Sequence, residues 1–510
     1  MTAAGRSRTT VLAACAALFA LVPAAVAQSE DRAVAERTKT PIKHFISLMQ
    51  ENHSFDNYFG TYPGADGIPK GTCMPVDPRA EFRMGGRTWR YGERRRFERF
   101  VRRQGLTYSG WARRNPHDAA LVFGDARAQA SAPRGGCIPA FHIGDRAVQD
   151  LGHTRRVFAD QYAGGQMDGF VYAIERDIGR IDRMVMGHYD DRDIPYYWNV
   201  ADEYVLFDRF FTSAGGGSVW NHMFWVSGTP GNYDADVIPE GGFGDIPTIF
   251  DRLEERGISW KFYVQNYDPT INLRSPGTGD RGSQLVWVPV LNYARFVDDP
   301  KLSSHIVDLE EFYADLDRGT LPAVSYIAPS GSSEHPPGSI QAGQRFVRTL
   351  INALMRSSAW KSSAFTWTYD DWGGFYDHVR PPRVDRYGYG FRAPALLVGP
   401  YAKRGHVDST TLDFTSYLKF IEHNWGLDPL AARDRRANNL LSAFDFDRPP
   451  RKAEFVSPVR HEPPREEPRR IAIYVIYTLS VAFTAAMIAL AVWAARRGMR
   501  RPHAREGVHR

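Results

Sequence analysis

The chain has 510 residues with a formal net charge of +6, and about 420 of them, between the end segments described below, are enough for one large α/β domain or two smaller domains. The positive charge lies at the two ends: Arg6 and Arg8 near the start, and six arginines after residue 495. The residues between these ends are close to neutral overall. A general nucleic-acid-binding protein carries its positive charge on the folded domain, so no nucleic-acid partner is predicted.

The first 27 residues have the layout of a secretory signal. Two arginines precede an uncharged apolar run at 11–22, and Ala25, Val26 and Ala27 offer small residues for cleavage before Gln28. Export would place Cys73 and Cys137 in an oxidising compartment, which favours one disulfide between them, with two unrelated free thiols as the alternative. So few cysteines exclude a metal-binding cysteine cluster.

Residues 28–447 alternate between strand and helix patterns. Six short apolar runs each end in a polar or glycine-rich turn, at 42–49, 204–211, 260–264, 323–328, 364–369 and 395–398. Helical patterns occupy 248–256, 345–355 and 412–425. This alternation predicts an α/β fold with a mostly parallel central sheet and helices on both faces. In such sheets the ligand lies beyond the carboxyl ends of the strands.

An arginine-rich insertion is predicted at 79–134, inside the loop that a disulfide between the two cysteines would close. Its segment 79–114 contains 12 arginines and several aromatic residues. One interpretation is a cap that meets anionic lipid headgroups or phosphate substrates. The other is a solvated helix whose arginines pair with Glu81, Glu93 and Glu98.

The C-terminal part predicts a membrane anchor. Residues 448–470 are rich in proline and charge, which is typical of an extended stalk. Residues 471–495 carry no charge, and this length at about 1.5 Å per residue is sufficient for a hydrocarbon core of about 30 Å. Arg496 and Arg497 follow directly, so the tail at 496–510 is predicted to be cytoplasmic. The sequence therefore predicts a single-pass cell-membrane protein whose main domain lies on the extracytoplasmic side.

Oxygen-bearing side chains follow two of the predicted strands. Glu51 and Asn52 come directly after the first apolar run, and their oxygens are hard donors that suit a divalent cation. Asp370 and Asp371 follow the fifth run. Adjacent carboxylates at a strand end repel each other unless a cation or a shared proton compensates.

Two further segments carry groups suited to phosphate chemistry. The glycines at 215–217 let the backbone approach a ligand closely, and Ser218 would lie at the start of a helix whose amides favour an anion. His335 is followed by two prolines and is a candidate acid or base.

Several blocks of the chain, in this order, resemble a known family. They are 51–60, 216–222, 334–337 and 369–379, with weaker matches at 164–170, preceded by His153, and at 418–427. These blocks are similar to those of the bacterial phosphoesterase family that contains the phosphatidylcholine-type phospholipases C and an acid phosphatase branch. The resemblance implies an alkaline-phosphatase-like α/β fold and hydrolysis of phosphate esters at a metal site.

The resemblance also implies roles for individual residues. One divalent metal ion of unspecified identity would be held by Glu51, Asn52, Ser218, Asp370 and Asp371, with Ser218 also acting as nucleophile. The phosphate oxygens or the leaving group would be held by Asn221, His153 and His335. Many relatives have arginine at position 53, glutamate at 371 and histidine at 414. The phospholipase C branch usually has threonine followed by Pro-Asn-Arg at 218–222, so this block is closer to the phosphatase branch.

Together these patterns predict an exported, membrane-anchored, metal-dependent phosphoesterase of the phospholipase C type. Ser218 would attack in line to give a phosphoseryl intermediate, and His335 would protonate the departing alkoxide. Its substrates would be phosphate esters, with phospholipids among the candidates. The alternative is an acid-phosphatase-type phosphomonoesterase, and a third hypothesis is a non-catalytic binding protein tethered to the membrane.

Overall fold

The computed structural model describes residues 37–78, 81–90, 93–116, 118–119, 137–277, 283–460, 479–480 and 483–494. The chain divides into two units, Met1–Arg460 and His461–Arg510. The predicted signal (1–27) and cytoplasmic tail (496–510) lie outside the described residues, as do 461–470 of the predicted stalk and 471–478, 481–482 and 495 of the predicted span at 471–495. No helix in the described ranges combines the length and hydropathy that crossing a bilayer requires.

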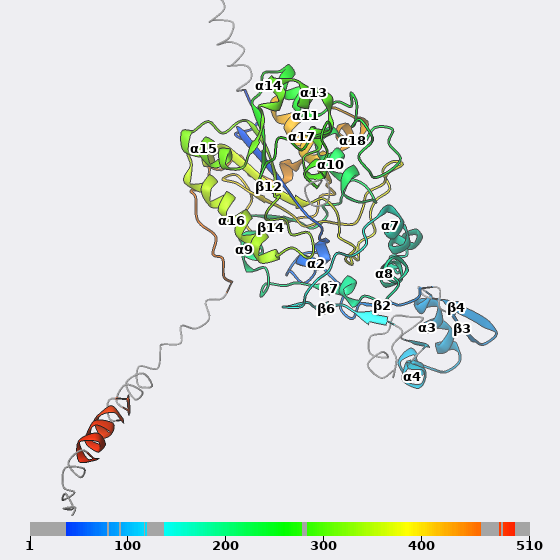
Figure 1. The fold of residues 1–510 in the computed structure, drawn as a ribbon. Coiled ribbons are helices and arrows are strands. Elements are labelled where there is room, and N and C mark those ends of the chain that lie inside the picture. Colours follow the sequence, from blue (N-terminus) through cyan, green and yellow to red (C-terminus); the bar gives the residue numbers. More distant parts are fainter. Residues whose placement is uncertain are drawn as a thin grey trace, which may run out of the picture. The chain divides into compact units, whose positions relative to one another are not determined.

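An eight-stranded sheet lies at the centre of the first unit (Figure 1). Its strand order is β10-β9-β11-β1-β12-β13-β8-β14. The strands are β1 (His44–Gln50), β8 (Val205–Phe207), β9 (Trp260–Val264), β10 (Ile306–Asp308), β11 (Val324–Ala328), β12 (Ser363–Tyr369), β13 (Ala395–Val398) and β14 (His406–Asp408). All neighbours pair in parallel except β13, which is antiparallel to β12 and β8.

The two central strands, β1 and β12, set the position of the site. They pair in parallel over their whole length, from His44 opposite Ser363 to Gln50 opposite Tyr369. Nearly every residue of both strands is buried, as expected for a parallel sheet covered on both faces. Because the register is unstaggered, both strands end at the same level.

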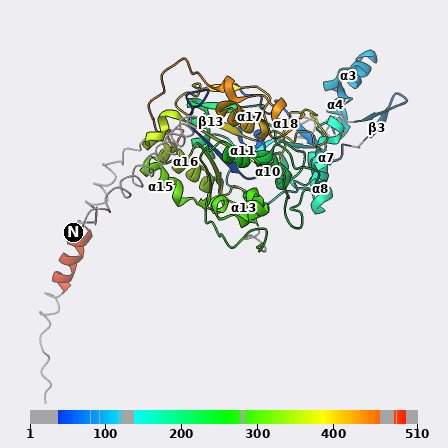
Figure 2. The ribbon, with the colours of Figure 1, turned by 90° about the horizontal axis from the view of Figure 1, so that it is seen from above.

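Helices cover both faces of this sheet. One face packs against α9 (Pro195–Glu203), α15 (Glu310–Arg318) and α16 (Ile340–Arg356), and the other against α10 (Ser218–Ser227), α11 (Ile249–Glu255) and α17 (Phe414–Trp425) (Figures 1 and 2). On the first face Tyr197 of α9 lies 5.5 Å from Trp367, ring centre to ring centre. On the second, the indole of Trp225 in α10 donates to Ser47 Oγ at 2.9 Å. The predicted α/β fold is confirmed.

The remaining elements of the first unit are short. They are α2 (Phe55–Phe59), β6 (Phe141–His142), α7 (Arg155–Tyr162), α8 (Phe170–Ile178), β7 (Gly187–His188), α12 (Gln284–Trp287), α13 (Ala294–Asp298), α14 (Pro300–Ser303) and α18 (Ala432–Arg436). The six predicted strands and three predicted helices all occur. The edge strands β10 and β14 were not predicted, because three residues are too few to give a pattern.

The arginine-rich insertion has a core of its own. Strands β2 (Cys73–Pro75) and β5 (Cys137–Pro139) pair at its base, where Cys73 and Cys137 form a disulfide. Between them lie the hairpin β3 (Glu81–Met84) and β4 (Arg87–Arg90), then α3 (Arg94–Arg103) and α4 (Tyr108–Arg114). Its buried centre includes Trp89, Phe97, Val101 and Trp111. We call residues 81–119 the basic module.

Candidate active site

Four of the five predicted metal ligands meet at the carboxyl ends of β1 and β12. Glu51 and Asn52 follow β1, Asp370 and Asp371 follow β12, and all four are at most 1% exposed. The Asp370 amide donates to the Gln50 carbonyl at 3.0 Å, which continues the ladder into the site. Asn52 has a φ of +62°, so the chain turns sharply at this point.

Close backbone packing supports this turn. A Cβ atom on Gly373, which follows the Asp370-Asp371 pair and has a φ of +60°, would lie 2.2 Å from the Asn52 carbonyl oxygen. Only glycine fits such an approach, and the positive φ also disfavours any other residue. The glycine therefore brings the two strand ends into contact.

The buried carboxylates of this cluster outnumber the positive charge beside them, which among the described residues is that of His153, 3.9 Å from Asp371. Burial, together with the neighbouring carboxylates of Asp370 and Asp371, raises the pKa of Glu51 well above its usual range. Burial and Asp370 raise the pKa of Asp371 in the same way. Among the described residues no lysine or arginine forms an ion pair with any of the three. Buried carboxylates in this arrangement need either protons or a cation.

Individual atoms point to a cation. Glu51 Oε1 and Asp370 Oδ2 are buried and have no hydrogen-bond partner in the described part of the chain. The Asn52 amide lies between His153 and the carboxylates. Its oxygen accepts from His153 Nε2 at 3.2 Å, and its nitrogen donates to Asp370 Oδ1 at 2.8 Å and Glu51 Oε2 at 2.9 Å, when the amide is turned so that both of its ends are satisfied. The two carboxylate oxygens without a partner therefore remain as the donors that a hard cation would bind.

A second acidic cluster shows the contrast. Asp56, Asp377 and His378 also lie close together. There the buried guanidinium of Arg392 pairs with Asp56 at 2.9 Å and with Asp377 at 3.0 Å. The charge of this cluster is already balanced, so it needs no ion.

Ser218 lies beside the carboxylate cluster at the start of α10. Its Oγ donates to Asp371 Oδ2 at 3.5 Å. The glycine loop brings the chain there, and the side chain of the buried Asn221 shapes that loop. The Asn221 Oδ1 accepts from the Ala214 amide at 2.9 Å, and its Nδ2 donates to the Gly217 carbonyl at 3.2 Å. A role for Asn221 in holding phosphate stays a prediction.

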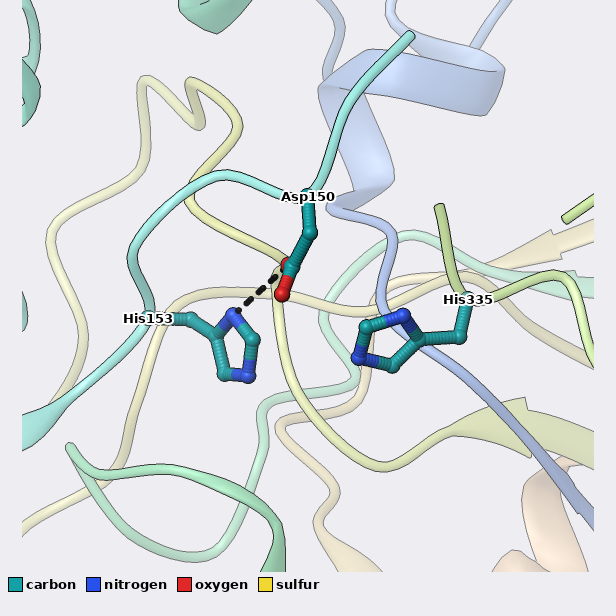
Figure 3. Close-up of side chains that lie close together, drawn as sticks. All are labelled: Asp150, His153 and His335. Atoms are coloured by element: carbon teal, nitrogen blue, oxygen red, sulfur yellow. Dashed lines mark ion pairs between the residues drawn. The ribbon is translucent and has the colours of Figure 1, made fainter. Parts of the chain in front are cut away.

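Two histidines flank the cluster on the solvent side. His153 Nε2 lies 3.9 Å from Asp371 Oδ2, and its Nδ1 lies 3.5 Å from Asp150. Burial lowers the pKa of His153, but the carboxylates of Asp371 and Asp150 outweigh it and raise that pKa to about 9. His153 is therefore a cation at neutral pH. The rings of His153 and His335 lie side by side, 5.8 Å apart between centres (Figure 3).

The loop that carries His335 is held firmly to the sheet. The His335 Nδ1 donates to the Pro336 carbonyl at 2.8 Å, which leaves Nε2 as the free ring nitrogen. The preceding Glu334 is buried and accepts hydrogen bonds from the hydroxyls of Tyr58, Tyr197 and Tyr369. Burial raises the pKa of Glu334 to about 7, although the three tyrosines lower it.

Two residues of the site were not assigned roles from the sequence. His222 Nδ1 donates to the Ser218 carbonyl at 2.9 Å, so the lone pair of Nε2 faces Glu51 Oε1 at 3.6 Å. Burial lowers the pKa of His222, which keeps the ring neutral and able to bind a cation. Its spacing of four residues from Ser218 on a helix was the available signal. Trp287 lies near Glu51 and acts to lower the pKa of its carboxyl, and no sequence pattern links these two residues.

A cavity of about 560 Å³ opens next to His335. Its walls are partly apolar, with Ile271, Trp287, Pro336 and Pro337, and partly polar, with Ser333. His335 is the one predicted site residue among the residues that line this cavity.

A family model now identifies the chain's relatives. The model of the Phosphoesterase family matches residues 42–428. This chain belongs to that family. The predicted hydrolase of phosphate esters is confirmed at the level of the family.

Curated members of this family include phospholipases C. Phospholipase C B of Mycobacterium tuberculosis is 27% identical over 460 residues, covering 81% of this chain and 79% of the relative. The non-hemolytic phospholipase C of Burkholderia pseudomallei is 27% identical over 495 residues, which cover 85% of this chain and 63% of that relative. The solved structure of a protein in the alkaline phosphatase superfamily from Vibrio parahaemolyticus is 14% identical, with a TM-score of 0.31. The match covers 47% of this chain and 61% of that protein. The alkaline-phosphatase-like part of the predicted fold stays a prediction.

Proposed function

We propose that this phosphoesterase is an exported, membrane-anchored, metal-dependent enzyme of the phospholipase C type with Ser218 as its nucleophile. The observation that carries the proposal is the position of the Ser218 hydroxyl, 3.5 Å from Asp371 and beside Glu51 and Asp370, whose buried Oε1 and Oδ2 atoms have no hydrogen-bond partner in the described part of the chain. A binding protein without catalysis would need no nucleophile at this place.

The residues present fit one divalent cation. Glu51, Asn52, Asp370, Asp371 and Ser218 would hold it through oxygen atoms, and the neutral ring of His222 offers a nitrogen beside them. Such an ion supplies a Lewis acid that activates the hydroxyl and offsets charge on the phosphate oxygens. The donor set is compatible with Ca²⁺, Mg²⁺, Mn²⁺ or Zn²⁺.

The chain's own groups divide the remaining work. Ser218 attacks phosphorus in line with the departing oxygen while its hydroxyl proton passes to Asp371 Oδ2, the acceptor that it faces at 3.5 Å. The bond from phosphorus to the leaving alkoxide breaks, and water then hydrolyses the phosphoseryl intermediate. The charged ring of His153 orients and stabilises the anionic phosphate, whereas the Trp220 amide in the first turn of α10 already donates to Asp236 Oδ1 at 2.8 Å. His335 Nε2, the free nitrogen of its ring, protonates the departing alkoxide.

Sequence patterns support export and anchoring. The signal pattern at 1–27 and the uncharged segment at 471–495 are the basis of this part of the proposal. The disulfide between Cys73 and Cys137 agrees with it, because disulfides persist in oxidising compartments.

The nucleophile is tested with two substitutions at one position. Ser218→Ala should abolish turnover of phosphate esters while the melting temperature and the bound metal are retained. Ser218→Thr keeps a hydroxyl and serves as the matched variant, with measurable activity expected. An active Ser218→Ala protein would contradict the assignment.

A phosphomonoesterase is the second candidate, because the block at 218–222 is closer to the acid phosphatase branch. Phosphatidylcholine and a soluble aryl phosphate, assayed side by side, separate the two functions. Turnover of phosphatidylcholine with release of diacylglycerol supports a phospholipase C, whereas turnover of the monoester alone supports a phosphatase.

A further inference from the structure

The basic module carries a dense array of exposed positive charge. Helix α3 has six exposed arginines: Arg94, Arg95, Arg96, Arg99, Arg102 and Arg103. The hairpin and α4 add five more: Arg83, Arg87, Arg90, Arg113 and Arg114. Residues 81–119 contain eleven arginines and only four acidic residues, so the module is strongly cationic, and the rest of the chain between its two ends is acidic overall.

Acidic side chains of the module neutralise little of this charge. Glu93 pairs with Arg96 at 2.9 Å, and Glu98 pairs with Arg94 at 3.1 Å. Both pairs are short-range helix pairs near the surface, which contribute little to stability. The interpretation of a helix whose arginines are paired therefore holds for only part of α3.

The arginines of α3 are arranged on one side of the helix. Arg95, Arg99, Arg102 and Arg103 follow the spacing i, i+4, i+7 and i+8, which places them together. In the described part of the chain these four have no ion-pair partner. The opposite side of α3 is already used: Phe97 packs against Trp89 at 5.0 Å and Trp111 at 4.4 Å between ring centres. The apolar side is thus not available for insertion into a bilayer.

From this arrangement we propose that the basic module docks the protein electrostatically on an anionic phospholipid surface. The partner is argued from charge: lipid phosphates complement the guanidinium groups, which bind phosphate in a bidentate manner. Basic clusters next to a membrane act in this way, and each arginine raises the affinity for an anionic surface by about a factor of five. The binding itself does not depend on Ser218. The idea that docking brings the active site to lipid esters rests on the proposed function.

The test measures how the full chain partitions onto lipid vesicles. All proteins carry Ser218→Ala so that lipid is not consumed, and each is centrifuged with phosphatidylglycerol vesicles and with phosphatidylcholine vesicles. The readout is the ratio of the two partition coefficients, because apolar binding through other parts of the chain, including 471–495, affects both lipids alike. The six arginines after residue 495 are the same in every variant, so the ratios are compared between variants. Replacing Arg95, Arg99, Arg102 and Arg103 by glutamine should lower this ratio by about 600-fold at low salt, about fivefold for each arginine.

Two matched variants separate charge from structure. Replacing the same four arginines by lysine should retain the ratio within about threefold, because the charge remains. Replacing four exposed arginines elsewhere, Arg256, Arg356, Arg383 and Arg435, by glutamine should leave it unchanged. Raising the salt concentration should reduce the ratio of the parent protein toward one.

Several outcomes would overturn the proposal. They are an unchanged ratio in the glutamine variant, equal binding of the parent to both lipids, or binding to duplex DNA without binding to phosphatidylglycerol. The same glutamine variant, made with Ser218 intact, should hydrolyse a soluble aryl phosphate ester at the parent rate. A glutamine variant that loses vesicle binding but keeps full activity on the soluble ester separates docking from catalysis. If neither the parent protein nor the variant hydrolysed the soluble ester, that result would count against the proposed function alone.

Discussion

The end of the central sheet and the basic module handle charge in opposite ways. At the sheet end, Glu51, Asp370 and Asp371 are at most 1% exposed and have no lysine or arginine among their described ion-pair partners. In the module, arginines are exposed around a small core closed by a disulfide. Buried charge of one sign raises pKa values and demands a specific ion, whereas exposed charge of one sign stays solvated and attracts a surface. The first arrangement suits chemistry and the second suits docking.

The largest expected effect comes from removing one buried carboxylate. Asp370→Asn takes away a ligand atom and should lower kcat/KM for any phosphate ester by a factor of about 10³ or more. In metal-free protein the same change removes repulsion from Glu51 and Asp371, so the free energy of unfolding should rise. Chemical denaturation in the presence of a chelator measures this rise.

Asp377→Asn is the matched control for that experiment. It breaks a buried pair with Arg392 instead of relieving repulsion, so it should destabilise the protein with or without a chelator. If Asp370→Asn also destabilised the metal-free protein, the two clusters would not differ as described.

Removing the ring of His335 should have the next largest effect. His335→Ala should slow turnover of esters with a poor leaving group by about 10²–10⁴-fold, because general acid catalysis is lost. Aryl esters with an acidic leaving group need little protonation, so their rates should fall much less. Steady-state rates across a series of leaving groups measure the difference, and an equal loss for all esters would contradict the role.

Breaking the disulfide should affect the module and spare the site. Replacing Cys73 and Cys137 by serine opens a loop between positions separated by 64 residues and should destabilise the module by about 2–4 kcal/mol. Hydrogen exchange should show faster opening of 81–119 while turnover of a soluble ester persists. Loss of that activity would mean that the two regions are not independent.

The smallest expected effect concerns the pH dependence of stability. The pKa of Glu334 rises to about 7 on folding, so the folded state holds a proton that the unfolded state releases near pH 4.5. Stability from this group is present at low pH and is lost as pH rises through this window, at up to about 1.4 kcal/mol per pH unit. Glu334→Gln should flatten that slope in denaturant titrations between pH 5 and pH 8, and an unchanged slope would contradict the pKa.

The sequence was sufficient to predict the sheet and the meeting of its strand ends. Glu51 and Asp370 each follow directly after a strand, and parallel neighbouring strands bring the residues after their carboxyl ends to the same edge of the sheet. The antiparallel direction of β13 and the three-residue edge strands were not predictable, because long connections and short strands leave no periodic signal.

Other features of the site could be seen only in the folded structure. His222 faces Glu51 only because α10 enters at a particular angle, and Trp287 reaches the same carboxylate from a distant helical turn. For the basic module the sequence left two interpretations open. The ion pairs of Glu93 and Glu98 show how few of the α3 arginines are neutralised.

The cation site can be tested most directly by anomalous X-ray scattering from crystals of the protein prepared with Mn²⁺. We predict one strong peak bonded to oxygens of Glu51, Asp370 and Asp371 with the Ser218 hydroxyl beside it. A peak at Asp56, Asp377 and His378 instead, or no peak between β1 and β12, would contradict the proposed metal centre.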